Sequence, residues 1–165
     1  MIRVGLGVDV HAFGPARALV IGGVTIPHER GLEGHSDADV LSHAIVDSLL
    51  GAAGLGDIGR HFPTSDPRWE GCSSLEFLSE VRRMLAVAGW RPGNVDSVII
   101  AQEPRMAPHL PAMHEAVAGA LEMAVADVSI KATSTDALGA VGRREGIAAQ
   151  AVVLIGSTAA TSEAG

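Results

Sequence analysis

Hydrophobic and polar positions along the chain follow two periods, one typical of strands and one typical of helices. Short apolar runs rich in β-branched residues predict four strands, at residues 2–10, 95–101, 128–133 and 148–155. Residues 18–27 predict two more strands, joined at the Gly22-Gly23 pair that is typical of a hairpin turn.

The first helix is predicted over residues 40–53, where apolar residues recur at helical spacing until Gly54 ends the pattern. Ser36 is a favourable N-cap residue ahead of this stretch. With Ser36 as the cap, Asp37 and Asp39 fall in the first turn, where the helix dipole favours negative charge.

A second helix is predicted over residues 74–89, with Gly89 as its C-cap. Its apolar face is predicted to carry Leu75, Leu78, Leu85 and Ala88. A third helix is predicted from about Pro111 to Val125, and residues 57–73 predict a loop.

Strands and helices alternate without a linker or an internal repeat. This order predicts an α/β fold in one compact domain, residues 1–156, with a sheet packed on helices. Residues 157–165 are small and polar, and we expect them to fray.

Composition narrows the classes of protein that fit. The chain has 165 residues, of which 47% are hydrophobic and 19% charged, so it collapses rather than staying disordered. With a net charge of -7 and 3% aromatic residues, the chain lacks the basic surface and the stacking side chains of a nucleic-acid binder. High apolar content with little charge also raises the prospect of apolar surface buried between subunits.

Cys72 is the only cysteine, so an intramolecular disulfide is impossible, and we expect an ordinary surface thiol rather than a nucleophile. The N-terminal residues carry Asp9 and His11 early, unlike the apolar region of a signal peptide. No apolar run reaches the ~18 residues of a membrane span. These features predict a cytoplasmic protein without membrane contact.

Asp9 and His11 form the sharpest local feature. Residues i and i+2 of a strand project from one face, so a carboxylate and an imidazole emerge side by side. His43, on the first predicted helix, is a third candidate ligand for a zinc-type site. The alternatives are a surface polar pair at Asp9 and His11 and a hydrogen-bonded core histidine at His43.

Two further clusters suit phosphate chemistry. His35 precedes the expected helix N-terminus, itself an anion-binding site, and is a candidate to hold a phosphate oxygen. Residues 131–136 run off a strand with three hydroxyl groups, and Asp136 is a candidate ligand for magnesium. Helix capping at the first cluster and an ordinary turn at the second are the alternatives.

Several longer motifs occur in one order along nearly the whole chain. They are residues 7–13 (GVDVHAF), 34–40 (GHSDADV), 49–59 (LLGAAGLGDIG), 62–63, 94–96, 99–106 (IIAQEPRM) and 131–133. On these motifs the chain resembles the 2-C-methyl-D-erythritol 2,4-cyclodiphosphate synthases of the non-mevalonate isoprenoid pathway.

The resemblance implies a small α+β domain of ferredoxin-like character and a homotrimer around a sheet-lined axis, with active sites between subunits. It implies that 4-diphosphocytidyl-2-C-methyl-D-erythritol 2-phosphate is cyclised with release of CMP. The implied cofactors are Zn²⁺ (or Mn²⁺) at Asp9, His11 and His43, and Mg²⁺ or Mn²⁺ bridging the diphosphate, with Asp136 as a possible ligand.

His35 and Ser134 match the family's transition-state stabilisers. The residues that match its substrate contacts are Asp9, His11, His35, Ser36, Asp57, Ile58, Gly59, Phe62, Asp66, Ala101, Arg105, Met106, Ala107, Thr133, Ser134, Thr135, Asp136 and Arg143. An acidic chain that binds such a substrate is expected to depend on metal ions for positive charge.

Six positions depart from the family pattern, two of them mildly, since Ser134 replaces a common Thr and keeps the hydroxyl while Arg105 replaces a frequent Lys and keeps the cation. Asp136 stands where relatives often carry Glu, and Thr64 where they often carry Asp. Ala140 replaces an aromatic residue beside the trimer axis and is expected to widen the cavity there. Arg144 replaces glycine, so it either adopts a positive φ at some cost or shifts the turn.

Two other functions remain as alternatives at this stage. A zinc hydrolase of phosphate esters would use metal-bound water and give a linear product. A non-catalytic trimeric sensor would bind a cytidine nucleotide or a prenyl diphosphate without turnover.

Overall fold

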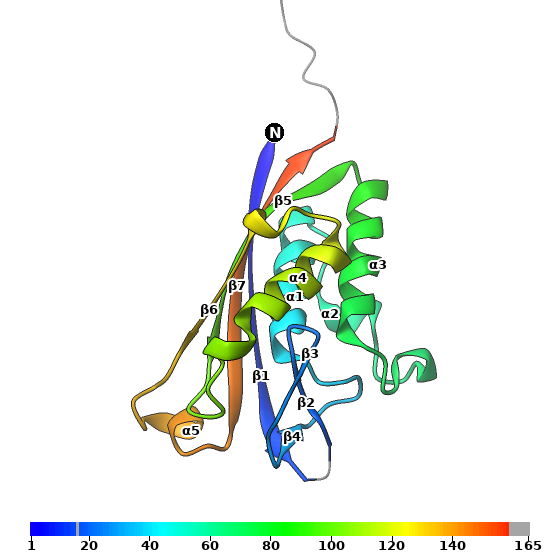
Figure 1. Cartoon of the computed structure of the whole chain (residues 1–165). Helices are drawn as coiled ribbons and strands as arrows, with labels where there is room; N and C mark the ends of the chain where they lie inside the picture. The colour runs from blue at the N-terminus through cyan, green and yellow to red at the C-terminus, as the bar shows by residue number, and fades with distance from the viewer. Residues whose placement is uncertain (16, 159–165) are drawn as a thin grey trace, which may run out of the picture.

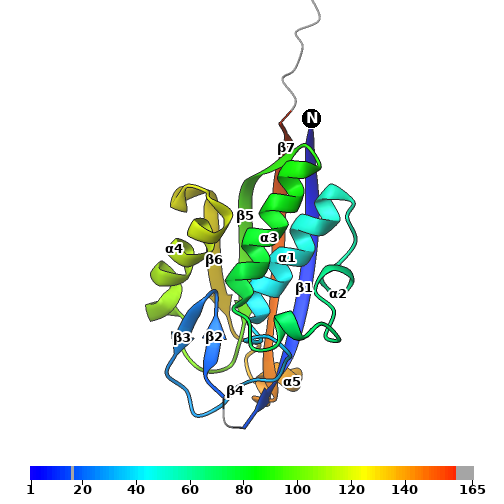
Figure 2. The same ribbon diagram turned by 90° about the vertical axis from the view of Figure 1, so that its right-hand side faces the viewer.

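A mixed five-stranded sheet carries all the long helices on one of its faces (Figures 1 and 2). The computed structural model describes residues 1–15 and 17–158. The strand order is β4-β1-β7-β5-β6, and a separate two-stranded hairpin lies beside the sheet. The α+β class predicted for the chain is confirmed.

The central strands pair over most of their length. The strands are β1 (Ile2–Gly14), β2 (Leu19–Ile21), β3 (Val24–Ile26), β4 (Gly31–Leu32), β5 (Trp90–Ile100), β6 (Val128–Thr133) and β7 (Gly146–Ser157). Strand β7 lies antiparallel to both β1 and β5, and β6 lies parallel to β5. The predicted hairpin is confirmed, because β2 and β3 join at Gly22 and Gly23, both with positive φ. Of the tail predicted to fray, Ser157 ends β7 and residues 159–165 lie outside the described residues.

The helices match the predicted positions with differences at their ends. They are α1 (Val40–Ala53), α2 (Ile58–His61), α3 (Ser74–Val87), α4 (Leu110–Leu121) and α5 (Gly139–Gly142), with 3-10 turns η1 (Pro67–Trp69), η2 (Ala107–His109) and η3 (Val125–Asp127). The predicted loop at 57–73 thus contains α2 and η1. Helix α4 stops before Val125 because Glu122 adopts a left-handed conformation, with φ 51°.

The predicted apolar face of α3 is partly wrong. The buried apolar residues are Phe77, Leu78, Val81 and Leu85, whereas Leu75 is only half-buried and Ala88 is exposed beyond the helix end. The helix is rotated so that Phe77 faces the core, and this places an aromatic ring next to the functional site described below.

Ser36 is not the N-cap of α1, contrary to the sequence prediction. Asp39 is the cap, and its carboxylate accepts hydrogen bonds from the N–H groups of Leu41 and Ser42. The same fully buried carboxylate also accepts from the hairpin N–H groups of Gly22 and Gly23, at 2.9 and 2.7 Å. One side chain therefore satisfies both the helix end and the hairpin turn, whereas the Ser36 hydroxyl accepts from the Ala38 N–H before the helix begins.

Asp39→Ala is expected to lower the free energy of unfolding by about 3 kcal/mol, because it removes a cap and leaves buried hairpin donors without partners. Denaturant unfolding measures the loss. Ser73→Ala removes the simpler cap of α3, where one hydroxyl accepts from Leu75, and is the matched control at about 1 kcal/mol. Equal losses in the two variants would contradict this role for Asp39.

Two glycines in β1 let α1 approach the sheet closely. A Cβ at Gly5 would lie 1.9 Å from the Ser48 carbonyl oxygen, and one at Gly7 would lie 2.0 Å from that of Ala44. Asp9 and His11 continue this inner face of β1 because strand residues alternate between faces. The close contact brings them toward the first turn of α1, which carries His43.

The opposite face of β1 is bare and apolar. Ile2, Val4, Leu6, Val8 and Val10 are 67, 65, 66, 49 and 62% exposed. The long helices α1, α3 and α4 lie on the other face of the sheet, and the short helix α5 (Gly139–Gly142) lines a small cavity with Val10 (Figure 1). This row of residues extends onto β7 at Val152, which is paired with Leu6. A contiguous apolar sheet face of this kind is typical of an interface rather than of a solvated surface.

Candidate metal site and substrate pockets

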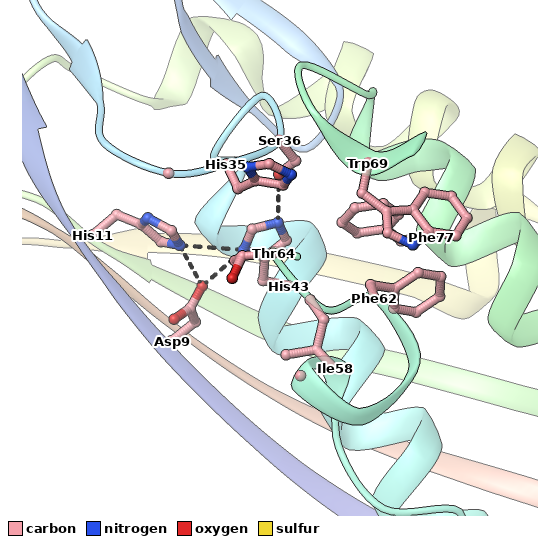
Figure 3. Close-up of a pocket in the computed structure, with 12 residues that line it drawn as sticks. Asp9, His11, His35, Ser36, His43, Ile58, Phe62, Thr64, Trp69 and Phe77 are labelled. Carbon is pink, nitrogen blue, oxygen red and sulfur yellow. Dashed lines mark hydrogen bonds and ion pairs between the residues drawn. The ribbon is translucent and has the colours of Figure 1, made fainter. Parts of the chain in front are cut away.

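Asp9 and His11 from β1 and His43 from α1 converge on one point (Figure 3). The Asp9 Oδ2 atom lies 2.8 Å from His11 Nε2 and 3.1 Å from His43 Nδ1, and the two nitrogens are 3.2 Å apart. They form the only group of three or more metal-ligand side chains found among residues 1–15 and 17–158. Asp9 and His11 are therefore not a separate surface pair, because they meet His43, whose ring is also hydrogen-bonded to Ser36 and Ser74 as the alternative for a core histidine required.

Hydrogen bonds fix the orientation of both imidazoles. The His11 Nδ1–H donates to the Glu33 carbonyl, and the His43 Nε2–H faces the hydroxyls of Ser36 and Ser74 at 3.1 and 3.0 Å. In these tautomers the remaining nitrogens, His11 Nε2 and His43 Nδ1, turn their lone pairs toward Asp9.

Three acceptors facing one another call for a cation between them. Burial opposes ionisation of Asp9, but when His11 Nε2 and His43 Nδ1 carry protons their hydrogen bonds to the carboxylate outweigh burial and hold the pKa of the carboxyl well below its usual range. Burial also opposes protonation of His11, and its hydrogen bond with Asp9 outweighs that effect and raises the pKa of the imidazole. The site favours positive charge, which either a proton or a metal ion can provide.

The donor set fits a tetrahedral divalent ion. Ligand atoms about 2.0–2.1 Å from such an ion stand about 3.3–3.4 Å apart. The separations of 3.1 and 3.2 Å are near this spacing, and that of 2.8 Å between Asp9 and His11 is shorter. One carboxylate and two imidazoles are common zinc ligands, and three protein ligands leave a fourth position open to substrate.

A cavity of about 300 Å³ adjoins the three ligands. It is lined by Asp9, His11, Gly34, His35, Ser36, His43, Ile58, Gly59, Phe62, Thr64, Trp69 and Phe77. His35 therefore lies beside the ligands as the sequence suggested, and its buried Nε2 has no hydrogen-bond partner among the described residues. Asp39 occupies the N–H groups of Leu41 and Ser42 at the N-terminus of α1, so the unpartnered His35 Nε2, rather than the helix end, is the polar group beside the cavity.

An aromatic wall closes the cavity on the side away from β1 (Figure 3). The rings of Phe62 and Phe77 stack with centroids 4.4 Å apart, and Trp69 packs edge-on against both. Phe77 also stacks on the His43 ring, at 5.9 Å. The three aromatic rings therefore line the cavity, and one of them, Phe77, also packs against the His43 imidazole.

The turn that carries Ile58 and Gly59 is anchored from α1. The Asp47 carboxylate accepts a hydrogen bond from the Ile58 N–H at 2.7 Å, and burial raises the pKa of Asp47. Asp57 caps α2 by accepting from the Arg60 N–H, and Asp66 pairs with Arg68. Asp57 and Asp66 therefore stand beside the cavity rather than in its lining.

A second pocket of about 280 Å³ lies where β5 and β6 end. It is lined by Ala101, Gln102, Pro104, Arg105, Met106, Ala107, Ala132, Thr133 and Ser134, six of which are among the residues matched to the family's substrate contacts. No residue lines both pockets, so the residues matched to substrate contacts fall into two separate groups within one chain.

Thr135, Asp136 and Arg143 line neither pocket. The Ser134 hydroxyl donates to the Asp136 carboxylate at 3.0 Å, so within one chain this segment is the hydrogen-bonded turn considered as an alternative. Arg143 forms an ion pair with Glu145 at 2.7 Å and is exposed.

Arg144 adopts the left-handed conformation expected if the glycine of relatives had positive φ there, with φ 62°. Its side chain pairs with Glu103 at 3.2 Å, and its carbonyl accepts from Arg30. The neighbouring Ala140 lines a small cavity with Val10 and Val141 on the bare side of the sheet. The turn before β7 therefore keeps its left-handed backbone at residue 144 although arginine, rather than glycine, stands there.

Cys72 is not a candidate nucleophile. Burial and a hydrogen bond to Glu76 raise the pKa of its thiol to about 12, so the thiolate is absent at neutral pH. The sequence interpretation of an ordinary thiol agrees with this environment.

Four residues around the site have roles there that the sequence did not predict. Ser74 and Asp37 lie behind His43, Asp47 anchors the turn at Ile58, and Phe77 stacks on His43. Asp47 follows His43 by one helical turn, which was a usable signal that a carboxylate shares the face of that ligand. The contact between Asp37 and Ser74 joins residues far apart in the chain and had no local signal.

The fold and the site together define a metal-binding α+β domain of an enzyme. The model of the YgbB family matches residues 2–156, and the chain belongs to that family. A relative from Moorella thermoacetica named 2-C-methyl-D-erythritol 2,4-cyclodiphosphate synthase is 56% identical over 154 residues, which cover 93% of this chain and 94% of the relative.

Solved structures agree with this assignment. The IspF of Plasmodium falciparum in a CDP complex matches with a TM-score of 0.83 and 31% identity, over 96% of this chain and 97% of that one. The bifunctional IspDF of Campylobacter jejuni matches with a TM-score of 0.91 and 38% identity over 95% of this chain, which spans only 42% of that longer protein. No helix in the described part of the chain has the length and hydropathy of a membrane span.

Proposed function

We propose that the protein converts 4-diphosphocytidyl-2-C-methyl-D-erythritol 2-phosphate to 2-C-methyl-D-erythritol 2,4-cyclodiphosphate and CMP, in isoprenoid precursor biosynthesis in the cytoplasm. The observation that carries the proposal is the convergence of Asp9, His11 and His43 on one point beside a cavity. Membership of the YgbB family and the names of the relatives support it. The enzyme is then a phosphorus-oxygen lyase.

In this reaction an oxygen of the 2-phosphate forms a bond to the β-phosphorus of the diphosphate. The bond from that phosphorus to the bridging oxygen breaks, and CMP leaves with the electron pair. Because the attacking phosphate is tethered within the substrate, the chain needs to supply no nucleophile. Its tasks are to bend the substrate, to offset negative charge and to exclude water.

Named residues suit each task. Ser36, Ile58, Gly59, Phe62 and Thr64 line the cavity and would hold the methylerythritol part, with Asp57 and Asp66 beside them. His35 would donate from its unpartnered Nε2 to an oxygen of the reacting phosphate, and the Ser134 hydroxyl would do so from the second pocket.

Asp9, His11 and His43 would hold Zn²⁺, with Mn²⁺ as the other candidate, and Asp136 would be a ligand for Mg²⁺ or Mn²⁺. The exposed Asp136 carboxylate is bonded only locally, to Ser134, and is accessible from solvent. Bound divalent ions supply the positive charge that draws two anionic phosphoryl groups together and stabilises the leaving group.

A homotrimer would bring the two pockets together. One chain carries the metal ligands and another carries the pocket at residues 101–107 and 133–136, together with Arg143. The bare apolar face of β1 supplies a surface on which a second copy of the chain can dock. The CDP complex of the Plasmodium falciparum relative supports a cytidine diphosphate ligand for the second pocket.

Identification of the product tests the proposed reaction. Incubation of the purified protein with the diphosphocytidyl substrate, Zn²⁺ and Mg²⁺ is expected to yield CMP and a cyclic diphosphate, which ³¹P NMR distinguishes from a linear one. A linear product would instead indicate a zinc phosphoesterase, and nucleotide binding without turnover would indicate a sensor.

Glu103 is expected to position the loop that would bind cytidine. Its carboxylate lies outside the pocket lining and is paired with Arg30 and Arg144, both at 3.2 Å, and with His28 at 3.7 Å. Arg30 in turn lies over the Phe13 ring at the end of β1. Glu103 therefore ties the loop to β1 and to the turn before β7.

Glu103→Gln is expected to weaken CDP binding about three- to tenfold, because partly exposed ion pairs contribute about 1 kcal/mol. Titration calorimetry measures the dissociation constant, and zinc affinity is expected to stay unchanged. Glu122→Gln removes an exposed ion pair with Arg82 at the end of α4 and is the matched control. Unaltered CDP affinity in Glu103→Gln would show that the network does not position the loop.

A further inference from the structure

The candidate metal ligand His43 is backed by two side chains, Ser74 and Asp37, that lie outside the three-ligand cluster. On the side away from Asp9, its Nε2 atom faces the Ser74 hydroxyl at 3.0 Å. Ser74 is fully buried at the start of α3, and the His43 side chain is only 11% exposed. A buried contact of this kind is not exchanged with water and can impose one arrangement of protons.

The direction of the Ser74 hydroxyl is set by Asp37. The hydroxyl donates to Asp37 Oδ1 in a short hydrogen bond, and the Ser74 N–H donates to Asp37 Oδ2 at 2.9 Å. A serine hydroxyl has one proton to donate. With that proton directed at Asp37, the Ser74 oxygen is left as an acceptor toward His43.

We propose that Asp37 and Ser74 are positioning residues that fix His43 in its Nε2–H tautomer and so direct the Nδ1 lone pair at the metal. The order of donation is His43 Nε2–H to Ser74 Oγ, and Ser74 Oγ–H to Asp37. The inference rests on the proposed metal site, and it extends that site to two residues outside the ligand set.

The backbone holds this chain of groups in place. The Asp37 N–H donates to the Cys72 carbonyl, and the Gly71 N–H donates to the His35 carbonyl, so residues 35–37 and 71–74 are bonded together. Asp37 Oδ1 also accepts from the Asp39 N–H. The segment before α1 and the segment before α3 thus form one unit behind the ligand, and Phe77 in α3 packs on the same imidazole ring.

Ser36 offers a second hydroxyl to His43, at 3.1 Å, but no carboxylate among the described residues is bonded to it; its other hydroxyl contact is Ser74 Oγ at 3.4 Å. It lines the substrate cavity, where its proton is available to other acceptors. Asp37 therefore distinguishes Ser74 from Ser36 as the group that selects the tautomer.

Metal affinity of the purified protein tests the inference. Ser74→Ala and Asp37→Asn are each expected to raise the zinc dissociation constant 10- to 100-fold, the usual effect of losing a residue that orients a metal-binding histidine. Competition with a chromophoric chelator measures the constant without reference to turnover. Ser73→Ala, which removes the neighbouring hydroxyl at the cap of α3, is the matched control and is expected to keep the affinity of the wild type.

The histidine tautomer gives a second readout that a structural role alone would not change. In metal-free wild type at pH 8, long-range ¹H–¹⁵N spectra are expected to show the His43 proton on Nε2. In Asp37→Asn the amide can donate to Ser74, which frees the hydroxyl to donate to His43 and shifts the proton to Nδ1.

Wild-type zinc affinity and an unchanged tautomer in both variants would overturn the inference while leaving the proposed function intact. Absence of zinc binding by the wild type would overturn the inference and the proposed metal site together.

Discussion

His43→Ala is expected to abolish zinc binding and CMP release together. The substitution leaves Asp9 and His11 as the only two ligands from the cluster, and it also removes the ring that Phe77 covers. Since a bound divalent ion contributes several kcal/mol to a transition state of this charge, turnover is expected to fall on the order of 10³-fold or more. Zinc content by mass spectrometry and CMP release by chromatography measure the two effects.

His114→Ala is the matched control for that experiment. His114 lies on α4, where its ring bonds the Leu110 carbonyl and the Ile130 N–H far from the metal ligands. Its replacement is expected to cost stability but to leave one zinc ion per chain. Full turnover by a zinc-free His43→Ala protein would contradict the proposed catalytic site.

Leu6→Asp is expected to convert a trimer into monomers and to remove most of the activity. Leu6 lies in the centre of the bare face of β1, 66% exposed between Val4 and Val8. Three buried and unpaired carboxylates around an apolar axis would cost several kcal/mol each if the proposed trimer formed. Loss of the proposed trimer is expected to lower activity, because the two pockets of neighbouring chains then no longer meet.

Light scattering after size exclusion measures the mass of each variant in solution. Val87→Asp is the matched control, because Val87 is 91% exposed at the end of α3 on the helix-covered side of the molecule. It is expected to assemble and to turn over as the wild type does. A fully active Leu6→Asp monomer would contradict a site shared between subunits.

The metal ligands were predictable because each depends on a local period. Alternation along a strand placed Asp9 and His11 on one face, and helical spacing placed His43 on a buried helix. Strand β1 and helix α1 pack closely because Gly5 and Gly7 have no side chains, which leaves room for the helix backbone. Sequence and fold therefore agree at this part of the site.

The parts that sequence reasoning got wrong depend on contacts between distant segments. Ser36 and Asp39 are both favourable N-cap residues. Asp39 is the cap in the structure, where its carboxylate also accepts hydrogen bonds from the N–H groups of Gly22 and Gly23 in the hairpin. The rotation of α3 that buries Phe77 follows from packing against α1 and the sheet. The hydrogen bond between Asp37 and Ser74 forms only when the segments before α1 and α3 pack together, so no local sequence pattern predicts it.

The separation of the two pockets is the feature with the largest consequence for function. The strand ends of β5 and β6 carry Thr133 and Ser134, whereas the metal ligands lie on β1 and α1. A resemblance to known enzymes supplied the expectation that the pockets meet between subunits. Within one chain they stay apart, and this is why the proposed activity depends on assembly.

Metal-dependent turnover is the most direct test of the account. Purified protein, supplied with the diphosphocytidyl substrate, Zn²⁺ and Mg²⁺, is expected to release CMP in equal amount to the cyclic diphosphate formed. Release is expected to stop when a chelator removes the ions and to return when both are added back. CMP release that continues at the full rate in metal-free protein would contradict the central claim that Asp9, His11 and His43 act through a bound metal ion.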